Sequence, residues 1–256
     1  MRSLIAFTKK EITDQIRSGK LLFLGILFLL FGIMNPAVAK LTPWLLEMFS
    51  EAMAESGMVI TEVTVSAMDS WVQFYKNIPM ALIAFVLIQG SIFTKEYTSG
   101  TLVLSLTKGF ERYKAVLSKT FTLMSLWSLG YWLCFGVTYV YNAYFWDNSI
   151  AQNLGLSALC WWLFGVWVIS MVVLFSTLFN STSGVILCSG GIAAVCYLMA
   201  IAPKIGRYLP TYLTDGTSLI YGVTEPEKYI AAIIITVALS VACLVLSIPI
   251  FNKKQL

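Results

Sequence analysis

Long apolar runs of about 20 residues divide this sequence, and each is long enough to cross the hydrocarbon core of a bilayer as a helix. Six membrane-spanning helices are expected, at residues 21–38, 77–94, 120–141, 154–179, 185–202 and 229–251. Only 12% of the 256 residues are charged, and the mean hydropathy is +0.80. A soluble domain carries about twice that charged fraction. The sequence therefore predicts an all-α, polytopic membrane protein that forms a single transmembrane domain over residues 1–256.

Several kinds of chemistry are disfavoured by the residues present. The chain has no histidine, which removes the commonest general base and metal ligand. No Asp, Glu, Lys or Arg lies in the middle of an expected span, which argues against a proton-coupled carrier or a charged ion filter. No GxxxxGK[ST] loop is present to hold ATP phosphates. We expect no metal site and no catalysis by this chain alone. Five cysteines lie inside apolar runs without a close pair and are interpreted as small buried hydrophobes: Cys134, Cys160, Cys188, Cys196 and Cys243.

Residues 1–20 form a basic amphipathic pattern rather than a span. Ile5, Thr8, Ile12 and Ile16 fall roughly on one helical face, and charged residues occupy the others. This pattern predicts a helix that lies in the membrane interface, with a solvated helical tail as the alternative. The segment is too charged for a cleavable signal peptide.

The longest connection is expected at residues 39–76, which are acidic yet rich in Leu, Met and Trp. Residues 41–57 have the pattern of an amphipathic helix that ends at Gly57. We expect this loop to lie on the outer membrane surface, as a cap over the span ends or as a gate for substrate. A second loop, at residues 203–228, is punctuated by Pro and Gly.

The basic residues predict the orientation of the chain. Six spans place both termini on the same side of the membrane. Residues 1–20, residues 94–119 and the C-terminal tail hold 12 of the 17 Lys and Arg residues, and the opposite loops hold five. Cytoplasmic loops carry the excess of Lys and Arg. Both termini and residues 94–119 are therefore predicted to be cytoplasmic.

Residues 94–119, TKEYTSGTLVLSLTKGFERYKAVLSK, place several basic charges between two apolar runs. Glu96 precedes Gly100-Thr101-Leu102 by four residues, and a short apolar run follows to Leu106. A turn at Lys108-Gly109 then leads to Arg112, and Lys119 stands where the third span is expected. The segment is predicted to form two helical pieces joined by that turn, as a cytoplasmic coupling helix between spans two and three.

This layout resembles the permease subunits of ATP-binding-cassette exporters, the type-2 permease family. Those often contain E…GTL, a short apolar run, a Pro turn, an Arg, and a Lys that enters the next span. Here Gly109 lies near the place of the usual Pro. The resemblance implies that residues 94–119 sit in a groove on a cytosolic ATPase subunit. General anchoring against anionic lipid is the alternative role for these charges. The implied coupling residues are Glu96, Gly100, Thr101, Lys108, Glu111, Arg112 and Lys114.

The resemblance also implies the other subunits and partners of the transporter. ATP and Mg²⁺ would be bound by the partner ATPase, and this chain would carry no cofactor. A second permease copy, as a homodimer or a pseudo-symmetric heterodimer, would complete the transporter in what we expect to be a bacterial plasma membrane. Membrane lipid is an expected partner and nucleic acid is not.

The implied function is export of a hydrophobic or amphipathic peptide, lipid or drug, with an amphipathic or cationic peptide favoured by the acidic outer loop and uncharged interior. Gln89 is a candidate either for a helix–helix hydrogen bond or for the translocation surface. An ATPase-independent channel or scaffold is the main alternative. An integral-membrane enzyme acting on lipids is disfavoured, because it would need a catalytic group within the membrane. Candidate residues of the translocation surface are Phe85, Gln89, Phe93 and Tyr197.

Overall fold

The computed structural model describes residues 2–54, 64–107 and 109–254, and this part of the chain is all-α. Six of its helical stretches are long and apolar enough to cross a membrane, which confirms the predicted all-α architecture with six candidate spans. These stretches are Lys20–Leu45, Ala67–Ser99, Arg112–Phe145, Leu154–Leu178, Thr182–Met199 and Glu227–Lys253.

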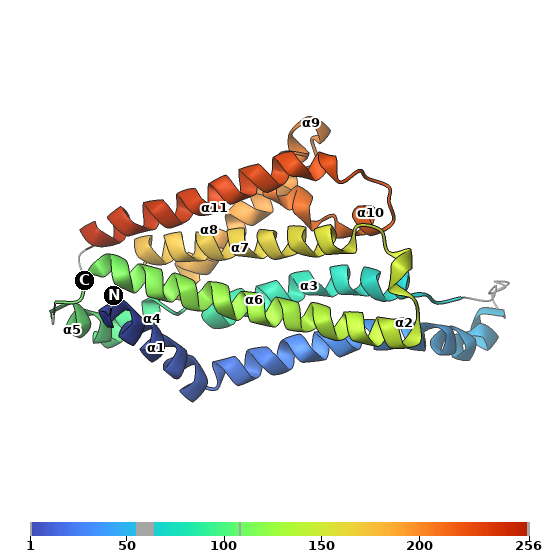
Figure 1. The fold of residues 1–256 in the computed structure, drawn as a ribbon, viewed down its shortest axis with the longest axis horizontal. Helices are drawn as coiled ribbons and strands as arrows, with labels where there is room; N and C mark the ends of the chain where they lie inside the picture. Colours follow the sequence, from blue (N-terminus) through green and yellow to red (C-terminus); the bar gives the residue numbers. More distant parts are fainter. Residues whose placement is uncertain (1, 55–63, 108, 255–256) are drawn as a thin grey trace.

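Both ends of the chain lie at the same end of the helical bundle, together with α1 (Arg2–Arg17), α4 (Thr94–Ser99) and α5 (Thr101–Thr107) (Figure 1). We call this the terminal end. The long helices that run away from it or return to it are α2 (Lys20–Ala54), α3 (Ala67–Gln89), α6 (Arg112–Phe145), α7 (Leu154–Leu178), α8 (Thr182–Met199) and α11 (Glu227–Lys253). Short helices complete the described chain: η1 (Asn148–Ile150), α9 (Pro203–Gly206), η2 (Pro210–Thr214) and α10 (Gly216–Ile220).

The first two long helices extend well beyond the expected spans. Helix α2 continues to Ala54, sixteen residues past the expected end at 38, and α3 begins at Ala67 rather than near 77. Most of the loop expected at 39–76 is therefore helix. Residues 41–54 are helical as expected but continue α2, and residues 55–57 lie outside the described part of the chain. Helix α6, which contains the third expected span, also begins early, at Arg112 rather than near residue 120.

Buried polar contacts join α2 to α3 and α6. Asn35 in α2 donates to Thr138 Oγ1 in α6 at 3.0 Å and accepts from Asn77 Nδ2 in α3 at 2.9 Å. These bonds satisfy amide groups that would otherwise be costly inside a membrane. At the start of α3, the Ser66 backbone amide donates to Asp69 Oδ2 at 2.8 Å, as in a capping box.

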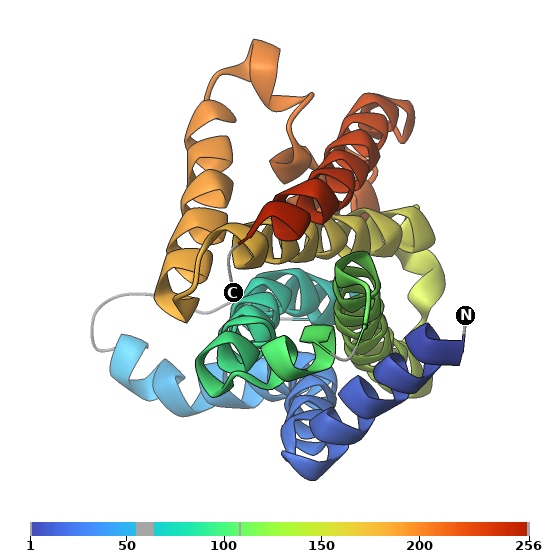
Figure 2. The same cartoon turned by 90° about the vertical axis from the view of Figure 1, so that its left-hand side faces the viewer.

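Helix α7 is the centre of the bundle, and α8 lies at its edge (Figure 2). In the most apolar 18-residue window of each helix, 67% of residues are buried in α7 but only 11% in α8. Helix α7 packs against α11, α6 and α8. The α6 contact is close because Gly165 faces the indole of Trp127, whose Nε1 donates to the Trp162 carbonyl at 3.1 Å.

The loop expected at 203–228 is folded back against the bundle. Trp161 Nε1 donates to the Thr214 carbonyl at 2.8 Å, and the Tyr229 hydroxyl donates to the Asp215 carbonyl at 2.9 Å. Leu213, Leu219 and Ile220 are fully buried. These contacts satisfy backbone groups that have no strand or long helix to pair with.

Replacing Gly165 by alanine should destabilise the fold, because the new Cβ would lie 2.2 Å from the Trp127 ring, which is itself fully buried. Overpacking of this kind costs roughly 1–3 kcal/mol. Thermal unfolding of the detergent-purified protein would measure it. The matched control is Gly136→Ala in α6, where a Cβ meets nothing within 4 Å and the thermal midpoint should not fall. Equal midpoints for both variants would contradict the packing argument.

Candidate functional site

Residues 94–119 form two short helices and the first turns of a long one. Helix α4 ends at Gly100, which has φ +67°, and α5 is followed by Gly109 with φ +86°. Glycine adopts this left-handed region without the clash that a Cβ causes. The turn predicted between two helical pieces is present at Gly109, where a proline could not adopt the φ, but the first piece is further divided at Gly100 into α4 and α5. Lys108 lies outside the described residues.

A buried lysine joins three helices at the terminal end. Lys119 in α6 is fully buried, and its Nζ donates to Glu11 Oε2 in α1 at 2.9 Å. The same nitrogen lies 2.8 Å from Glu96 Oε2 in α4 and donates to the Ile92 carbonyl at 3.0 Å. A buried ammonium is tolerated only when paired and hydrogen-bonded in this way. We call Lys119, Glu11, Glu96 and Lys10 the ionic clasp.

Lys10 completes the clasp from the more exposed side. Its Nζ bonds to Glu96 Oε1 and lies 3.2 Å from Glu11 Oε1 and 3.7 Å from Asp14 Oδ2. Burial lowers the pKa of the Lys10 ammonium, but hydrogen bonding and attraction from Glu96 and Glu11 outweigh it, so the pKa is raised. Each oxygen of the Glu96 carboxylate is thus in contact with one ammonium group, Oε1 with that of Lys10 and Oε2 with that of Lys119.

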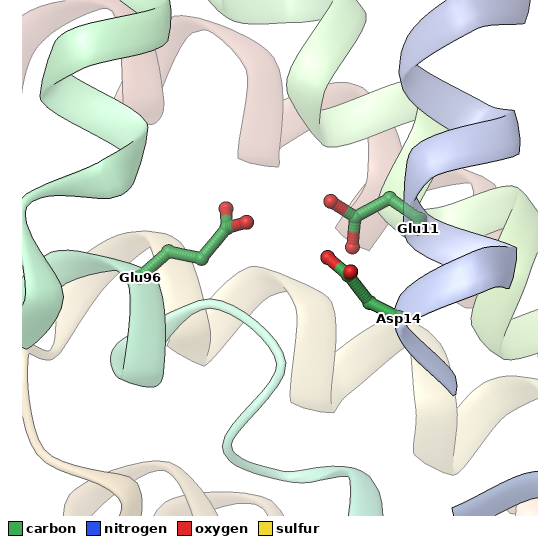
Figure 3. A group of neighbouring side chains, drawn as sticks. All are labelled: Glu11, Asp14 and Glu96. Atoms are coloured by element: carbon green, nitrogen blue, oxygen red, sulfur yellow. The ribbon is translucent and has the colours of Figure 1, made fainter. Parts of the chain in front are cut away.

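The three carboxylates of Glu11, Asp14 and Glu96 converge from α1 and α4 (Figure 3). One oxygen from each lies within 4.8 Å of the others, a spacing that could hold a metal ion. However, the ammonium groups of Lys10 and Lys119 already lie against Glu11 and Glu96 and neutralise much of their charge. The arrangement therefore fits an ion-pair network better than a cation site.

Helix α1 presents its polar residues to the bundle. Gln15 Oε1 accepts from Gln89 Nε2 in α3 at 2.9 Å, and both side chains are buried. Glu11 and Phe7 are buried on the same face, one and two turns earlier respectively, whereas Ile5, Ile12 and Ile16 are exposed. For Gln89 the structure shows the helix–helix hydrogen bond that was one of its two expected roles.

Arg112 binds the C-terminal end of α11. Its Nη1 donates to the carbonyls of Phe251 at 3.2 Å and Asn252 at 3.3 Å, and also to that of Lys254. A cation at this end interacts favourably with the helix dipole and with carbonyls that lack helical partners. Lys254 in turn donates to the Phe179 carbonyl at 3.0 Å and lies 4.3 Å from the Tyr97 ring centroid. The C-terminal tail is thereby tied to α4 and α6.

Comparison with known proteins identifies the family of this architecture. The family described as ABC-2 family transporter protein matches residues 5–256. The chain belongs to the ABC-2 transporter family. It is also similar to an uncharacterised transmembrane protein of Bacillus subtilis (strain 168), YxlG, with 24% identity over 223 residues that cover 82% of this chain and 81% of that protein. The family resemblance inferred from residues 94–119 is therefore confirmed.

Family membership establishes a coarse function. This ABC-2 chain is the membrane component of an ABC transporter, a permease that lacks an ATPase domain and is implied to work with an ABC ATPase. The comparisons do not concern individual residues, so the coupling and translocation residues remain predictions.

The structure divides the predicted coupling residues of this ABC-2 permease into two groups. Glu96 and Arg112 point inward and bind other helices of the same chain. Thr101 and Glu111 are exposed, and Glu111 Oε2 pairs with Lys114 Nζ at 2.7 Å. The hydrogen bond from Lys114 lowers the pKa of the exposed Glu111 carboxyl. Gly100 is the residue at which α4 ends, and it lies in the sequence between the inward-pointing Glu96 and the exposed Thr101.

The predicted translocation residues are also divided. Phe85, Gln89 and Phe93 are buried within the ABC-2 chain itself, where Phe85 packs edge-on against Trp127. Tyr197 is 45% exposed and lines an apolar groove. Sequence reasoning missed the clasp residues Lys10 and Glu11. The four-residue spacing of Phe7, Glu11 and Gln15 was the available signal, because it places them on one helical face.

Replacing Lys119 by methionine should destabilise the protein, because Glu11 would lose its deepest partner while remaining buried. Removing one partner of a buried ion pair costs about 3–5 kcal/mol. Residual pairing with Lys10 should bring the loss to the lower end of that range. The measurement is thermal or denaturant unfolding in detergent. Lys9→Met, on the exposed side of α1, removes the same charge and should have little effect. Equal stability of the Lys119→Met and Lys9→Met variants would contradict a stabilising role for the clasp.

Proposed function

We propose that this chain is the membrane subunit of an ATP-driven exporter, and that a separate ATPase delivers its energy through residues 94–119. The observation that carries the proposal is the junction of α4 and α5. Two short helices lie at the terminal end, interrupted by left-handed glycines, and are fixed to the bundle by the ionic clasp (Figure 1).

The contacts around this junction suit it to passing a force into the membrane. The segment follows α3 directly and leads into α6, so a push on α5 acts on both. The clasp links α4 to α1 through Lys119, and Arg112 links the start of α6 to the end of α11. Buried ion pairs and helix caps are stiff connections, whereas an exposed loop would absorb the movement.

The amphipathic pattern of α1 supports an interfacial position. Ile5 is 66% exposed and Ile16 57% exposed, although both are large and apolar, while the charged Glu11 is buried against α6. A helix in this arrangement would place its isoleucines among the lipid headgroups and acyl chains. With the excess of Lys and Arg at the terminal end, this favours cytoplasmic termini.

An apolar groove supports a hydrophobic or amphipathic cargo. It has a volume of about 330 Å³, lies between α3, α7 and α8, and is lined by residues that include Phe164, Tyr197 and Gly190. None of the described residues that line it is charged. The neighbouring face of α8 is mostly exposed, and we expect a second copy of the chain to cover it in a homodimer. An amphipathic peptide is the favoured cargo. The separate ATPase subunit would bind the ATP and Mg²⁺.

A new positive charge at the exposed positions of the coupling segment should release the ATPase. The test is co-purification of a cytosolic ABC ATPase from native membranes, identified by mass spectrometry. Glu111→Lys and Thr101→Arg alter exposed positions and should reduce recovery about tenfold, which corresponds to ~1.4 kcal/mol. Glu225→Lys makes the same charge change at an exposed position outside residues 94–119 and should leave recovery unchanged.

The outcomes of that experiment separate the two candidate functions. Loss of ATPase in the coupling variants alone supports the exporter. Recovery of no ATPase with the wild-type chain would favour a channel or scaffold. Equal recovery in all variants would show that the ATPase binds elsewhere.

Filling the groove should block export without unfolding the chain. Gly190 lines the groove and a Cβ there meets nothing within 4 Å, so Gly190→Leu adds bulk without a clash. Gly191 is equally open but does not line the groove, which makes Gly191→Leu the matched control. Cells that express Gly190→Leu should lose tolerance to a cationic amphipathic peptide, and those with Gly191→Leu should keep it. Equal tolerance would exclude the groove as the cargo path.

A further inference from the structure

A polar cavity at the terminal end lies beside the ionic clasp. It has a volume of about 490 Å³ and lies between α1, the start of α2, the turn after α3, α4 and α6. The three carboxylates of Figure 3 are among its lining residues. Arg17, Lys20 and Lys95 also line the cavity. Five of its lining residues are basic and three are acidic, so the cavity carries a net charge of +2.

Within the described part of the chain, the basic residues Arg17, Lys20 and Lys95 form no ion pair, whereas Glu11 and Glu96 are already engaged by Lys10 and Lys119. Lys20 is partly buried, and its Nζ donates only to neutral groups, the Ile88 carbonyl at 3.1 Å and Ser91 Oγ at 3.4 Å. The charges of Lys95 and Lys119 both repel it. A partly buried cation in such surroundings would gain from a bound anion.

Neutral hydrogen-bond donors line the same cavity. The hydroxyl group of Ser91 is present, and Gln15 lines the cavity although its side chain is more than nine-tenths buried. The Gln15 amide oxygen is occupied by Gln89, and no described residue accepts from its amide nitrogen. Two or three cations beside hydroxyl and amide donors are the groups that recognise a phosphate.

We propose that this cavity binds the phosphodiester group of an anionic phospholipid in the leaflet at the terminal end. The position of Lys20 favours a lipid over a free anion, because Lys20 is the first residue of the membrane span that begins α2. The next turns of that helix expose Leu22, Phe23 and Ile26, which offer an apolar surface for the acyl chains. The bound phosphate offsets the repulsion between Lys20 and Lys95 and bridges α2 to α4.

Native mass spectrometry of the detergent-purified chain would test the site, with phosphatidylglycerol, phosphatidylcholine and inorganic phosphate as separate titrations. The wild-type chain is expected to bind phosphatidylglycerol most tightly. Lys20→Gln and Lys95→Gln should each weaken that binding about fivefold, the factor given by ~1 kcal/mol per basic side chain at an anionic headgroup. Phosphatidylcholine binding should not change.

Lys9→Gln is the matched control, because Lys9 is an exposed lysine on α1 that lines a different groove, beside α6. It should leave phosphatidylglycerol binding within twofold of the wild type. Equal weakening by Lys9→Gln and Lys95→Gln would reduce the effect to general surface attraction and overturn the site. Displacement of the lipid by a modest excess of inorganic phosphate would overturn the assignment to a lipid. Because Lys95 is exposed, its variant keeps the test valid if Lys20→Gln fails to fold.

Discussion

The buried ammonium of Lys119 is the constraint on which the terminal end of this protein depends. An unpaired charge at this depth would be strongly unfavourable, so α6 requires carboxylates from two other segments. Glu11 can reach it only if α1 lies across the end of the bundle, and Glu96 only if the chain turns after α3. The same cation therefore fixes the position of the N-terminal helix and of the predicted coupling segment. We infer that the clasp contributes to specificity of the arrangement as much as to its stability.

The parts of the fold that sequence predicts are those with a local signal. Runs of apolar residues predict six candidate spans, and Lys108-Gly109 predicts a turn between helical pieces, because both signals depend on neighbouring residues alone. The pairing of Glu11 with Lys119 joins residues 108 apart, and no periodicity reports it. The length of α2 and α3 was missed because the residues that extend them, 39–54 and 67–76, include several charged residues and Pro43, which favour a loop outside the membrane.

In the candidate site, too, the local sequence motif was predictable and the contacts between distant residues were not. The spacing of Glu96, Gly100, Arg112 and Lys119 was sufficient to suggest the family, since it follows a local motif. The direction in which each side chain points was not predictable. Glu96 and Arg112 bind within the chain, to Lys119 and to the end of α11, so a motif residue can serve the coupling segment by holding it in place. The exposed residues of the segment, such as Thr101 and Glu111, are then the better candidates for contact with a partner.

Differences in burial indicate where such a permease would move. Separating α1 from α6 would expose or orphan Lys119 and Glu11, at a cost of about 3–5 kcal/mol. Helix α8 buries only 11% of its most apolar window, and its displacement within lipid would break few contacts of this kind. A force applied at α4 and α5 is therefore expected to move α1, α3 and α6 as one body. The apolar groove between α3, α7 and α8 would then change shape at its α8 wall, where the structure resists least.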